Sequence, residues 1–321
     1  MPSAVHKVAC DGCGLIRNRE ALHQVDASEF YSTNYALNTS KGEEHQFFVG
    51  GIPIPRSKVV FDWIADLLPR HFTSILEIGC GEGNVLARFR EGYQGVQLAG
   101  IEGSEPAAAI ARTKGLDVST GLVLPGQPSL PKADVVFSYG VLEHVEDVNY
   151  FLDVVRAACG SDGITIIGTP IMDEGGYDIF FADHVWHFHE LHLVRLLENR
   201  GFQILDIRTR HPVNSGFALV SAKPSSSFHE VTPLAVSVSL TSLANERDRW
   251  LLNFESLNNK LEPLMGRPIA VYGAGEVMSL LMAYTRLGDC QIKVFFDEDS
   301  GKIGLTKHGI TISHPNEETN Y

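Results

Sequence analysis

The densest group of chemically active side chains in the sequence is a histidine-rich segment over residues 180–190. Asp183 and His184 are adjacent there, and His187 and His189 follow closely. Histidine gains and loses a proton near neutral pH, and a neighbouring carboxylate can orient it and raise its pKa. The segment therefore predicts a general base, with His184 and Asp183 as first candidates. Two alternatives stay open: a site for a soft divalent metal such as zinc or iron, or histidines that pack the loop.

A glycine-rich turn forms a second candidate site. The apolar run over residues 75–78 is short enough for a buried parallel strand, and a helical segment over residues 85–90 follows the turn. Glycine occupies every second position of the turn, at Gly79, Gly81 and Gly83, and the acid Glu77 precedes the first of them. Strand, glycine turn and helix make the ligand-binding corner of an open α/β sheet, where a ligand can contact bare backbone. The spacing differs from the G-x-G-x-x-G of dinucleotide sites.

This pattern resembles the first motif of class I S-adenosylmethionine-dependent methyltransferases, and two further segments strengthen the resemblance. An expected second strand over residues 97–101 leads to Glu102, 23 residues after Gly79, where a carboxylate can accept both ribose hydroxyls. Residues 133–145 are similar to the family's fourth strand and the turn after it. The resemblance implies an α/β fold with a Rossmann-like doubly wound sheet, and S-adenosyl-L-methionine as the cofactor.

The resemblance also implies which residues contact the cofactor. They come from the glycine turn and from the ends of the expected strands: Glu77, Gly79, Gly81, Gly83, Glu102, Gly103, Leu122, Ser138 and Tyr139. Leu122 stands at the adenine position, where it offers no polar side chain. An aromatic segment before the core, with Tyr31 and Tyr35, folds over the cofactor or packs a covering segment onto the core.

Within this family, the chain resembles the sugar C-methyltransferases. They carry Tyr-x-Glu-His in the histidine loop, and Phe181–His184 is similar, with phenylalanine in place of the tyrosine. In those enzymes the His–Glu group is implicated in removing a proton beside a keto group. The resemblance therefore implies a small acceptor, a nucleotide-linked sugar, and His184 as the base. His144, in the turn after the expected fourth strand, is a second catalytic candidate.

The N-terminal region carries a candidate metal motif. Cys10 and Cys13 have the C-x₂-C spacing of a zinc knuckle, which needs two more ligands. No second C-x₂-C exists, and His6 and His23 are the nearest candidates. Sugar C-methyltransferases begin with a zinc-binding domain made from two such pairs. Both a zinc site and a turn without metal therefore stay open.

The C-terminal region predicts a second α/β unit. A long amphipathic helix over residues 240–262, suited to dimerisation or to joining domains, precedes a strand over residues 268–272. A turn at Gly273–Gly275 and a second strand ending at Asp297 complete a βαβ pattern. It mimics a dinucleotide site, with Met278 in place of the third glycine. The resemblance implies instead a Rossmann-like domain that helps to hold a nucleotide-linked sugar.

The chain thus divides into three predicted domains. They are an N-terminal cap with the cysteine motif over residues 1–55, an S-adenosylmethionine-binding domain over 56–224, and a C-terminal helix plus βαβ domain over 225–321. A length of 321 residues allows more than one core. The net charge of −13 disfavours nucleic acid, which needs a basic face. The lack of a membrane-length apolar run and the five cysteines favour a soluble, cytoplasmic protein.

Three functions are compatible with these patterns. The first is S-adenosylmethionine-dependent methyl transfer to a small, sugar-linked acceptor with a histidine base. The second is an NAD-dependent oxidoreductase that uses the C-terminal βαβ unit. The third is a non-catalytic protein that binds the cofactor without turnover. The long C-terminal helix also allows a homodimer.

Overall fold

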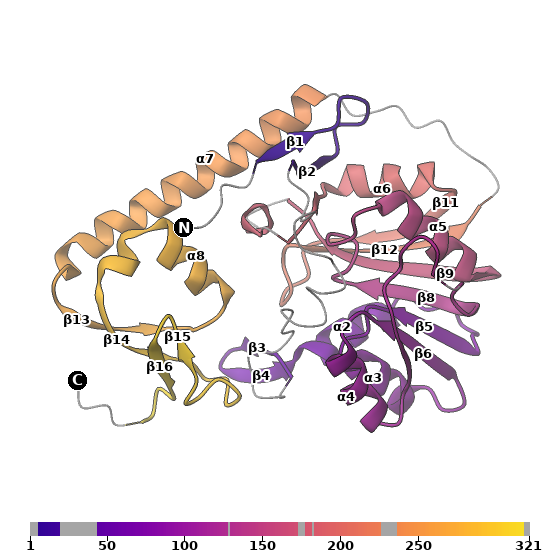
Figure 1. Cartoon of the computed structure of the whole chain (residues 1–321), viewed down its shortest axis with the longest axis horizontal. Helices are drawn as coiled ribbons and strands as arrows, with labels where there is room; N and C mark the ends of the chain where they lie inside the picture. Colours follow the sequence, from indigo (N-terminus) through magenta and orange to yellow (C-terminus); the bar gives the residue numbers. More distant parts are fainter. Residues whose placement is uncertain are drawn as a thin grey trace. The chain divides into compact units, whose positions relative to one another are not determined.

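The computed structural model describes residues 6–19, 44–127, 129–172, 177–181, 183–225 and 236–317. These residues form two compact units. The larger unit contains residues 6–19 and the described residues between 57 and 240. The smaller unit contains residues 44–56 and 241–317. Figure 1 shows the course of the chain, coloured from its N-terminus to its C-terminus.

A seven-stranded sheet forms the centre of the larger unit, in the order β11-β12-β9-β8-β5-β6-β7 (Figure 1). The strands are β5 (Ser74–Ile78), β6 (Gln97–Glu102), β7 (Asp117–Thr120), β8 (Ala133–Tyr139), β9 (Cys159–Pro170), β11 (Phe202–Arg208) and β12 (Phe217–Pro224). Strand β12 is antiparallel to β9 and β11, and the other neighbours are parallel. The chain order reverses at β5, which confirms the predicted doubly wound α/β sheet.

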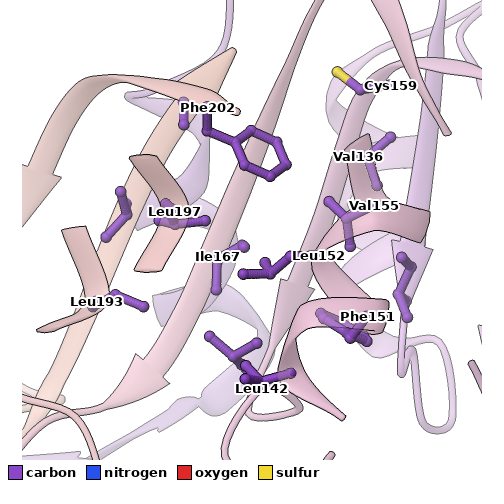
Figure 2. Packing of buried hydrophobic residues seen from close by; sticks show 14 of the residues in the cluster. Val136, Leu142, Phe151, Leu152, Val155, Cys159, Ile167, Leu193, Leu197 and Phe202 are labelled. Atoms are coloured by element: carbon purple, nitrogen blue, oxygen red, sulfur yellow. The ribbon is translucent and has the colours of Figure 1, made fainter. Parts of the chain in front are cut away.

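Helices cover both faces of this sheet. They are α2 (Arg56–Ala65), α3 (Asn84–Gly92), α4 (Glu105–Thr113), α5 (Val148–Ala158) and α6 (Glu190–Asn199). Helices α2 to α4 share one hydrophobic cluster with the sheet, and α5 and α6 share the other. Figure 2 shows the second cluster, where Leu152 of α5 and Leu197 of α6 lie on either side of Ile167 in β9. Apolar residues at helical spacing therefore hold α5 and α6 on the sheet.

Short polar side chains cap the N-termini of α4 and α5. Ser104 precedes α4, and its Oγ accepts a hydrogen bond from the backbone N–H of Ala107. Asp147 precedes α5 and accepts from the N–H of Tyr150 at 2.9 Å. Such caps satisfy backbone donors that the helix leaves unpaired. They fix where the chain leaves β6 and where it enters α5.

An N-terminal hairpin belongs to the larger unit. Its strands β1 (Lys7–Ala9) and β2 (Ile16–Asn18) are antiparallel. Strand β10 (Trp186–His187), from the histidine-rich segment, pairs with β2 and completes a three-stranded sheet. The backbone N–H of Asn18 also donates to the carbonyl oxygen of Val185 at 2.9 Å. The hairpin and the histidine loop are therefore one structural element, although they lie far apart in the sequence.

The smaller unit contains the predicted βαβ pattern. Its four-stranded sheet has the order β13-β14-β16-β15, with β13 (Pro268–Tyr272), β14 (Gln291–Phe296), β15 (Thr306–Lys307) and β16 (Ile310–Ser313). Helix α8 (Glu276–Tyr284) connects β13 to β14, and these strands are parallel. Strands β3 (Gln46–Val49) and β4 (Ile52–Pro55) form a separate hairpin in this unit. Short 3₁₀ helices are η2 (Asp178–Phe180), η3 (Glu262–Leu264) and η4 (Arg286–Asp289).

The long helix predicted for residues 240–262 is present as α7 (Val236–Leu261). Its use in dimerisation stays a prediction. Within the described ranges, every helix is too short or too polar to cross a lipid bilayer.

Replacing Leu197 by alanine tests the packing of α6. Leu197 has 0% of its surface exposed, so Leu197→Ala should lower the free energy of unfolding by about 2–5 kcal/mol through the cavity it leaves. Leu191→Ala, on the same helix, is the control. Leu191 is 42% exposed, and its loss should cost less than about 0.5 kcal/mol. Urea unfolding measures both, and equal losses would contradict the face that α6 turns to the sheet.

Candidate active site

The glycine turn lies between β5 and α3, where the sheet order reverses. Strand β5 pairs with β6 on one side and with β8 on the other. In open α/β sheets, ligands bind outside the carboxyl ends of the strands at this point. Gly79, Gly81 and Gly83 have φ angles of 75°, 54° and 73°. Side-chain-bearing residues rarely adopt such angles, so the backbone of the turn itself requires glycine.

Two of these glycines are also required by packing. A Cβ atom on Gly79 would lie 2.3 Å from Cγ2 of Val141, and one on Gly83 would lie 2.4 Å from Cδ1 of Leu116. Val141 belongs to the turn after β8, which also carries His144. The glycine turn and the turn after β8 are therefore in direct contact. A ligand bound at the glycine turn would therefore lie next to the turn after β8.

Glu102 holds the glycine turn through hydrogen bonds to backbone. Its Oε2 accepts from the N–H of Gly81 at 2.8 Å, and its Oε1 accepts from the N–H of Ser104 at 2.8 Å. The residue is only 6% exposed. Each carboxylate oxygen has a second lone pair, so two ribose hydroxyls can still be accepted. Glu102 therefore fits its predicted cofactor role and also ties the glycine turn to the start of α4.

Ser138 and Tyr139 end β8, and Ser138 pairs with Ile78 of β5. The Oγ atom of Ser138 is buried and makes no hydrogen bond within the described part of the chain. Tyr139 stacks on Phe217 with ring centroids 5.0 Å apart, and its hydroxyl accepts a hydrogen bond from Asn214. A buried hydroxyl without a partner needs an explanation, and a polar ligand beside β5 supplies one. Ser138 therefore fits the predicted cofactor, whereas a contact of Tyr139 with it stays a prediction.

The other predicted cofactor residues are placed as follows. Glu77 is buried within β5. Gly103 and Leu122 are half-buried and follow the ends of β6 and β7. Tyr31 and Tyr35 lie outside the described residues. Their contacts with a cofactor stay predictions.

His184 is held by a different acid from the one that the sequence suggested. Its Nδ1 forms a hydrogen bond with Oδ1 of Asp178, in η2. Asp183 faces His144 instead, whose Nδ1 lies 3.0 Å from the backbone oxygen of Asp183 and 3.7 Å from its Oδ2. The prediction that Asp183 orients His184 is therefore wrong. Adjacent side chains in non-helical backbone point in different directions, and η2 brings Asp178 to the ring instead.

Asp178 is a buried carboxylate shared by two histidines. Its Oδ2 accepts a hydrogen bond from Nδ1 of His187 at 2.5 Å, and the residue is 5% exposed. Burial raises the pKa of Asp178, but hydrogen bonds from His184 and His187 and their charges bring it well below the usual range. Asp178 is therefore ionised at neutral pH.

The two histidines respond to their surroundings in opposite ways. Burial lowers the pKa of His184, but the hydrogen bond and charge of Asp178, and then the charge of Glu143, outweigh it, so the pKa is raised. For His187, burial lowers the pKa by more than the hydrogen bond and charge of Asp178 raise it. The charge of Lys7 lowers it further, so the pKa of His187 lies below its ordinary value. His184 is therefore the better proton acceptor of the two.

His144, Glu143 and His184 form a cluster beside the ends of β8 and β9. The two imidazole rings meet edge to face, with centroids 4.7 Å apart. Nε2 of His144 lies 3.8 Å from Oε1 of Glu143, whose Oε2 accepts from the hydroxyl of Thr169 at 3.0 Å. Phe181 stacks on His184 at 4.6 Å. The predicted candidates His144 and His184 are thus brought together.

A metal ion is the alternative occupant of this region. Glu143, His144 and His184 bring one donor atom each to within 4.8 Å, and among the described residues no other such group comes close enough to hold an ion. Of the loop histidines predicted as metal ligands, His184 belongs to this group, whereas Nε2 of His187 lies 2.6 Å from Nζ of Lys7. A metal cation cannot approach a nitrogen that already faces an ammonium group. His189 packs against His192 of α6 instead. A metal ion at Glu143, His144 and His184 stays a prediction.

Cys10 and Cys13 lie in the turn of the N-terminal hairpin as exposed, free thiols. Hydrogen bonds from the backbone N–H groups of Cys13 and Gly12 lower the pKa of Cys10. No third ligand joins the pair among residues that the structure describes, and His23 lies outside them. Zinc at this turn stays a prediction.

The C-terminal glycine turn is held in the same way as the first. Oδ2 of Asp297 accepts from the N–H of Ala274 at 2.9 Å, as Glu102 does from its own turn. The same oxygen also binds Nζ of Lys302 at 3.2 Å. An NAD ribose would have to share this carboxylate with a buried lysine. Met278, at the third glycine position, is buried in the core of the unit. Neither feature favours the oxidoreductase alternative.

Four residues of the site were not predicted from the sequence: Lys7, Asn18, Glu143 and Asp178. Asp178 lies six residues before His184, a separation that marks no common face in a loop. Lys7 and Asn18 come from the N-terminal hairpin, and only the pairing of β2 with β10 brings them to the histidine loop. No pattern in the sequence could have found these two.

Comparison with known proteins agrees with this fold. Residues 55–207 match the family described as a methyltransferase domain. Trans-aconitate 2-methyltransferase of Mycolicibacterium gilvum (strain PYR-GCK) is 29% identical over 92 residues, which are 29% of this chain and 36% of that protein. The match therefore spans about a third of the curated relative.

Similar solved structures cover just over half of this chain. The 4+2 cyclase SpnF has a TM-score of 0.48 at 17% identity, over 58% of this chain and 90% of that one. The putative methyltransferase bound to the Haloferax volcanii Trm112 activator has a TM-score of 0.46 at 12% identity, over 53% and 91%. The family match spans slightly less than half of the chain and contains both the glycine turn and the histidine loop.

Replacing Glu102 by alanine tests the cofactor corner. Loss of a buried, charged hydrogen-bond acceptor costs roughly 1.5–3 kcal/mol, so Glu102→Ala should weaken S-adenosylmethionine binding by about 10- to 100-fold. Glu105→Ala is the control, because this exposed acid bonds Arg112 and Thr120 on the outside of α4 and β7. Titration calorimetry measures both affinities. An unchanged affinity in folded Glu102→Ala protein would contradict the assignment.

Elemental analysis tests the cysteine turn. If Cys10 and Cys13 hold zinc with two further ligands, purified protein should contain about one zinc per chain, and Cys10→Ser should release it. Cys290→Ser, in the smaller unit, is the control and should leave the zinc content unchanged. Less than about a tenth of an equivalent in protein never exposed to chelator would show that the turn holds no metal.

Proposed function

We propose that this protein transfers the methyl group of S-adenosylmethionine to a small acceptor, with His184 as the general base. The observation that carries the proposal is the pairing of His184 with the buried carboxylate of Asp178, beside the turn that touches the glycine corner. A methyltransferase domain supplies the fold for this chemistry. A histidine backed by a carboxylate supplies a proton acceptor next to the cofactor corner.

The chain's own residues hold the cofactor and the acceptor in position. Glu102 accepts the ribose hydroxyls, the glycine turn contacts the methionine end, and Ser138 offers its buried hydroxyl. When bound, S-adenosylmethionine supplies an electrophilic methyl group on a positively charged sulfur, and that sulfur is left as a neutral thioether. Alignment of the two reactants is the larger part of what such a site contributes.

His184 takes the proton that the acceptor loses. The acceptor's O–H or activated C–H bond gives its proton to Nε2 of His184, and the electron pair left behind forms the new bond to the methyl carbon. The Nδ1–H group of His184 keeps its hydrogen bond to Asp178. The negative charge of this carboxylate stabilises the imidazolium that forms. Glu143 adds a second negative charge close to the ring. His144, in edge-to-face contact with His184, is the second candidate for the base.

A nucleotide-linked sugar is the acceptor that we propose. The similarity of Phe181–His184 to the Tyr-x-Glu-His of sugar C-methyltransferases supports it, as does the C-terminal βαβ unit. Phe181 cannot supply the tyrosine hydroxyl, but its stacking on His184 keeps an aromatic ring at this position. The curated relative is named for trans-aconitate, a small acid, and supports only the small-molecule class. Labelled S-adenosylmethionine with a panel of keto- and hydroxy-sugar nucleotides and small acids separates these acceptors.

Replacing His184 by asparagine tests the base. His184→Asn should reduce kcat by about 10²- to 10⁴-fold, the usual contribution of general-base catalysis. Affinity for S-adenosylmethionine should stay within a few-fold, because the ring faces the acceptor. His71→Asn, at an exposed histidine, is the control and should keep the full rate. Near-normal kcat in His184→Asn on the true acceptor would move the base elsewhere, with His144 next in line.

The pH profile gives an independent measure of the same residue. Asp178 and Glu143 raise the pKa of His184 above its ordinary value of 6.5, and only the unprotonated ring can accept a proton. The wild-type rate should therefore rise with pH through an apparent pKa above 6.5. This limb should be absent from the residual rate of His184→Asn. A flat wild-type profile across that range would contradict the assignment.

A further inference from the structure

The N-terminal hairpin contacts the histidine loop through side chains that the proposed methyl transfer does not use directly. The pairing of β2 with β10 sets Ile16 opposite His187. Asn18, which is 1% exposed, donates from Nδ2 to the carbonyl oxygen of His184 at 2.8 Å. The hairpin therefore holds the backbone of the proposed base as well as the strand that follows it.

Lys7 faces the ring nitrogen of His187 that lies away from Asp178. Its Nζ lies 2.6 Å from Nε2 of His187 and 2.6 Å from Oδ1 of Asn18. Oδ1 of Asn18 lies farther from the same Nε2, at 3.3 Å. A lysine ammonium has three donors and no acceptor, so with Lys7 as the nearer partner Nε2 of His187 is the unprotonated nitrogen. Burial lowers the pKa of Lys7 to about 8, with Asp178 and Asp183 opposing the shift, so the ammonium form prevails at neutral pH. The proton of neutral His187 then lies on Nδ1.

Asp178 connects His187 to His184. Nδ1–H of His187 donates to Oδ2 of Asp178, and Oδ1 of the same carboxylate faces Nδ1 of His184. An ionised carboxylate only accepts hydrogen bonds, so Nδ1 of His184 must also carry a proton. Nε2 is then the nitrogen of His184 that can receive one. The hydrogen bonds thus run from Lys7 through His187 and Asp178 to His184.

We propose that Lys7 and Asn18 are positioning residues for His184, so that the N-terminal hairpin belongs to the acid–base apparatus of the site. Lys7 places a positive charge at Nε2 of His187, which keeps this ring from gaining a second proton, so that the charge of Asp178 is left to the imidazolium of His184. Asn18 fixes the backbone of His184 and shares the ammonium group of Lys7. The consequence for catalysis rests on the proposed function, but the arrangement of protons can be tested without an acceptor or a cofactor.

Nitrogen NMR of the histidine rings tests the proposal in the full chain at neutral pH. Two-bond proton–nitrogen spectra distinguish protonated from unprotonated ring nitrogens, and His184→Asn and His187→Asn assign the signals. Wild-type His187 should show a protonated Nδ1 and an unprotonated Nε2. Lys7→Met should abolish the unprotonated Nε2 signal and shift the ring signals of His184. Lys7→Arg, which keeps the donors, should restore the wild-type pattern.

Lys58→Met is the matched control. Lys58 is an exposed lysine of the same unit, paired with Asp62 on α2, and its loss should leave both histidine patterns unchanged. Once an acceptor is known, Lys7→Met should lower kcat by roughly 10- to 100-fold, as expected for a misplaced base, with S-adenosylmethionine affinity within about twofold. Lys7→Arg should recover most of that rate, which a loss of packing alone would not predict.

Two results would overturn the proposal. One is a protonated Nε2 in wild-type His187, which needs no variant to be folded. The other is an unchanged pair of histidine patterns in folded Lys7→Met protein. Failure of the proposed function has a different signature: the wild-type protein would neither bind S-adenosylmethionine nor transfer a methyl group, while its ring nitrogens would still show the expected pattern.

Discussion

The candidate site depends on one buried charge. Asp178 is almost completely removed from water, and an isolated carboxylate there would cost far more free energy than the fold can supply. Hydrogen bonds from two imidazole rings compensate it, so both histidines must present Nδ1–H to the same group. This requirement holds η2 and β10 together. It also brings in the N-terminal hairpin, because Lys7 balances the charge on the far side of His187.

The two units use the same device at their glycine turns. In each, a carboxylate at the end of the second strand accepts a hydrogen bond from a backbone N–H of the turn after the first: Glu102 from Gly81, and Asp297 from Ala274. The difference lies in the other partners. Among the described residues, the hydrogen bonds of Glu102 come from backbone donors, whereas Asp297 also holds the buried ammonium group of Lys302. The same local geometry therefore leaves lone pairs on Glu102 and pairs Asp297 with a cation.

Packing couples the cofactor corner to the proton acceptor. Gly79 has no room for a side chain because Val141 occupies that space, and Val141 stands three residues before His144. Trp186 then ties the histidine loop to the same turn, by donating from its indole nitrogen to the carbonyl oxygen of Val145. Rigid contacts of this kind place a base within the small tolerance that proton transfer allows.

The sequence by itself determined the elements, because their signals are local. Apolar periodicity marked α5 and β5, and the alternating glycines with Glu102 marked the cofactor corner, since a turn at positive φ leaves few other residues possible. The sequence also indicated His184 and His144 as candidate catalytic residues. Only the tertiary structure decided the partners. It replaced Asp183 by Asp178, and it added Lys7 and Asn18 through a strand pairing between distant segments. Hydrogen-bond partners in loops are set by backbone direction and long-range pairing, and neither leaves a period in the sequence.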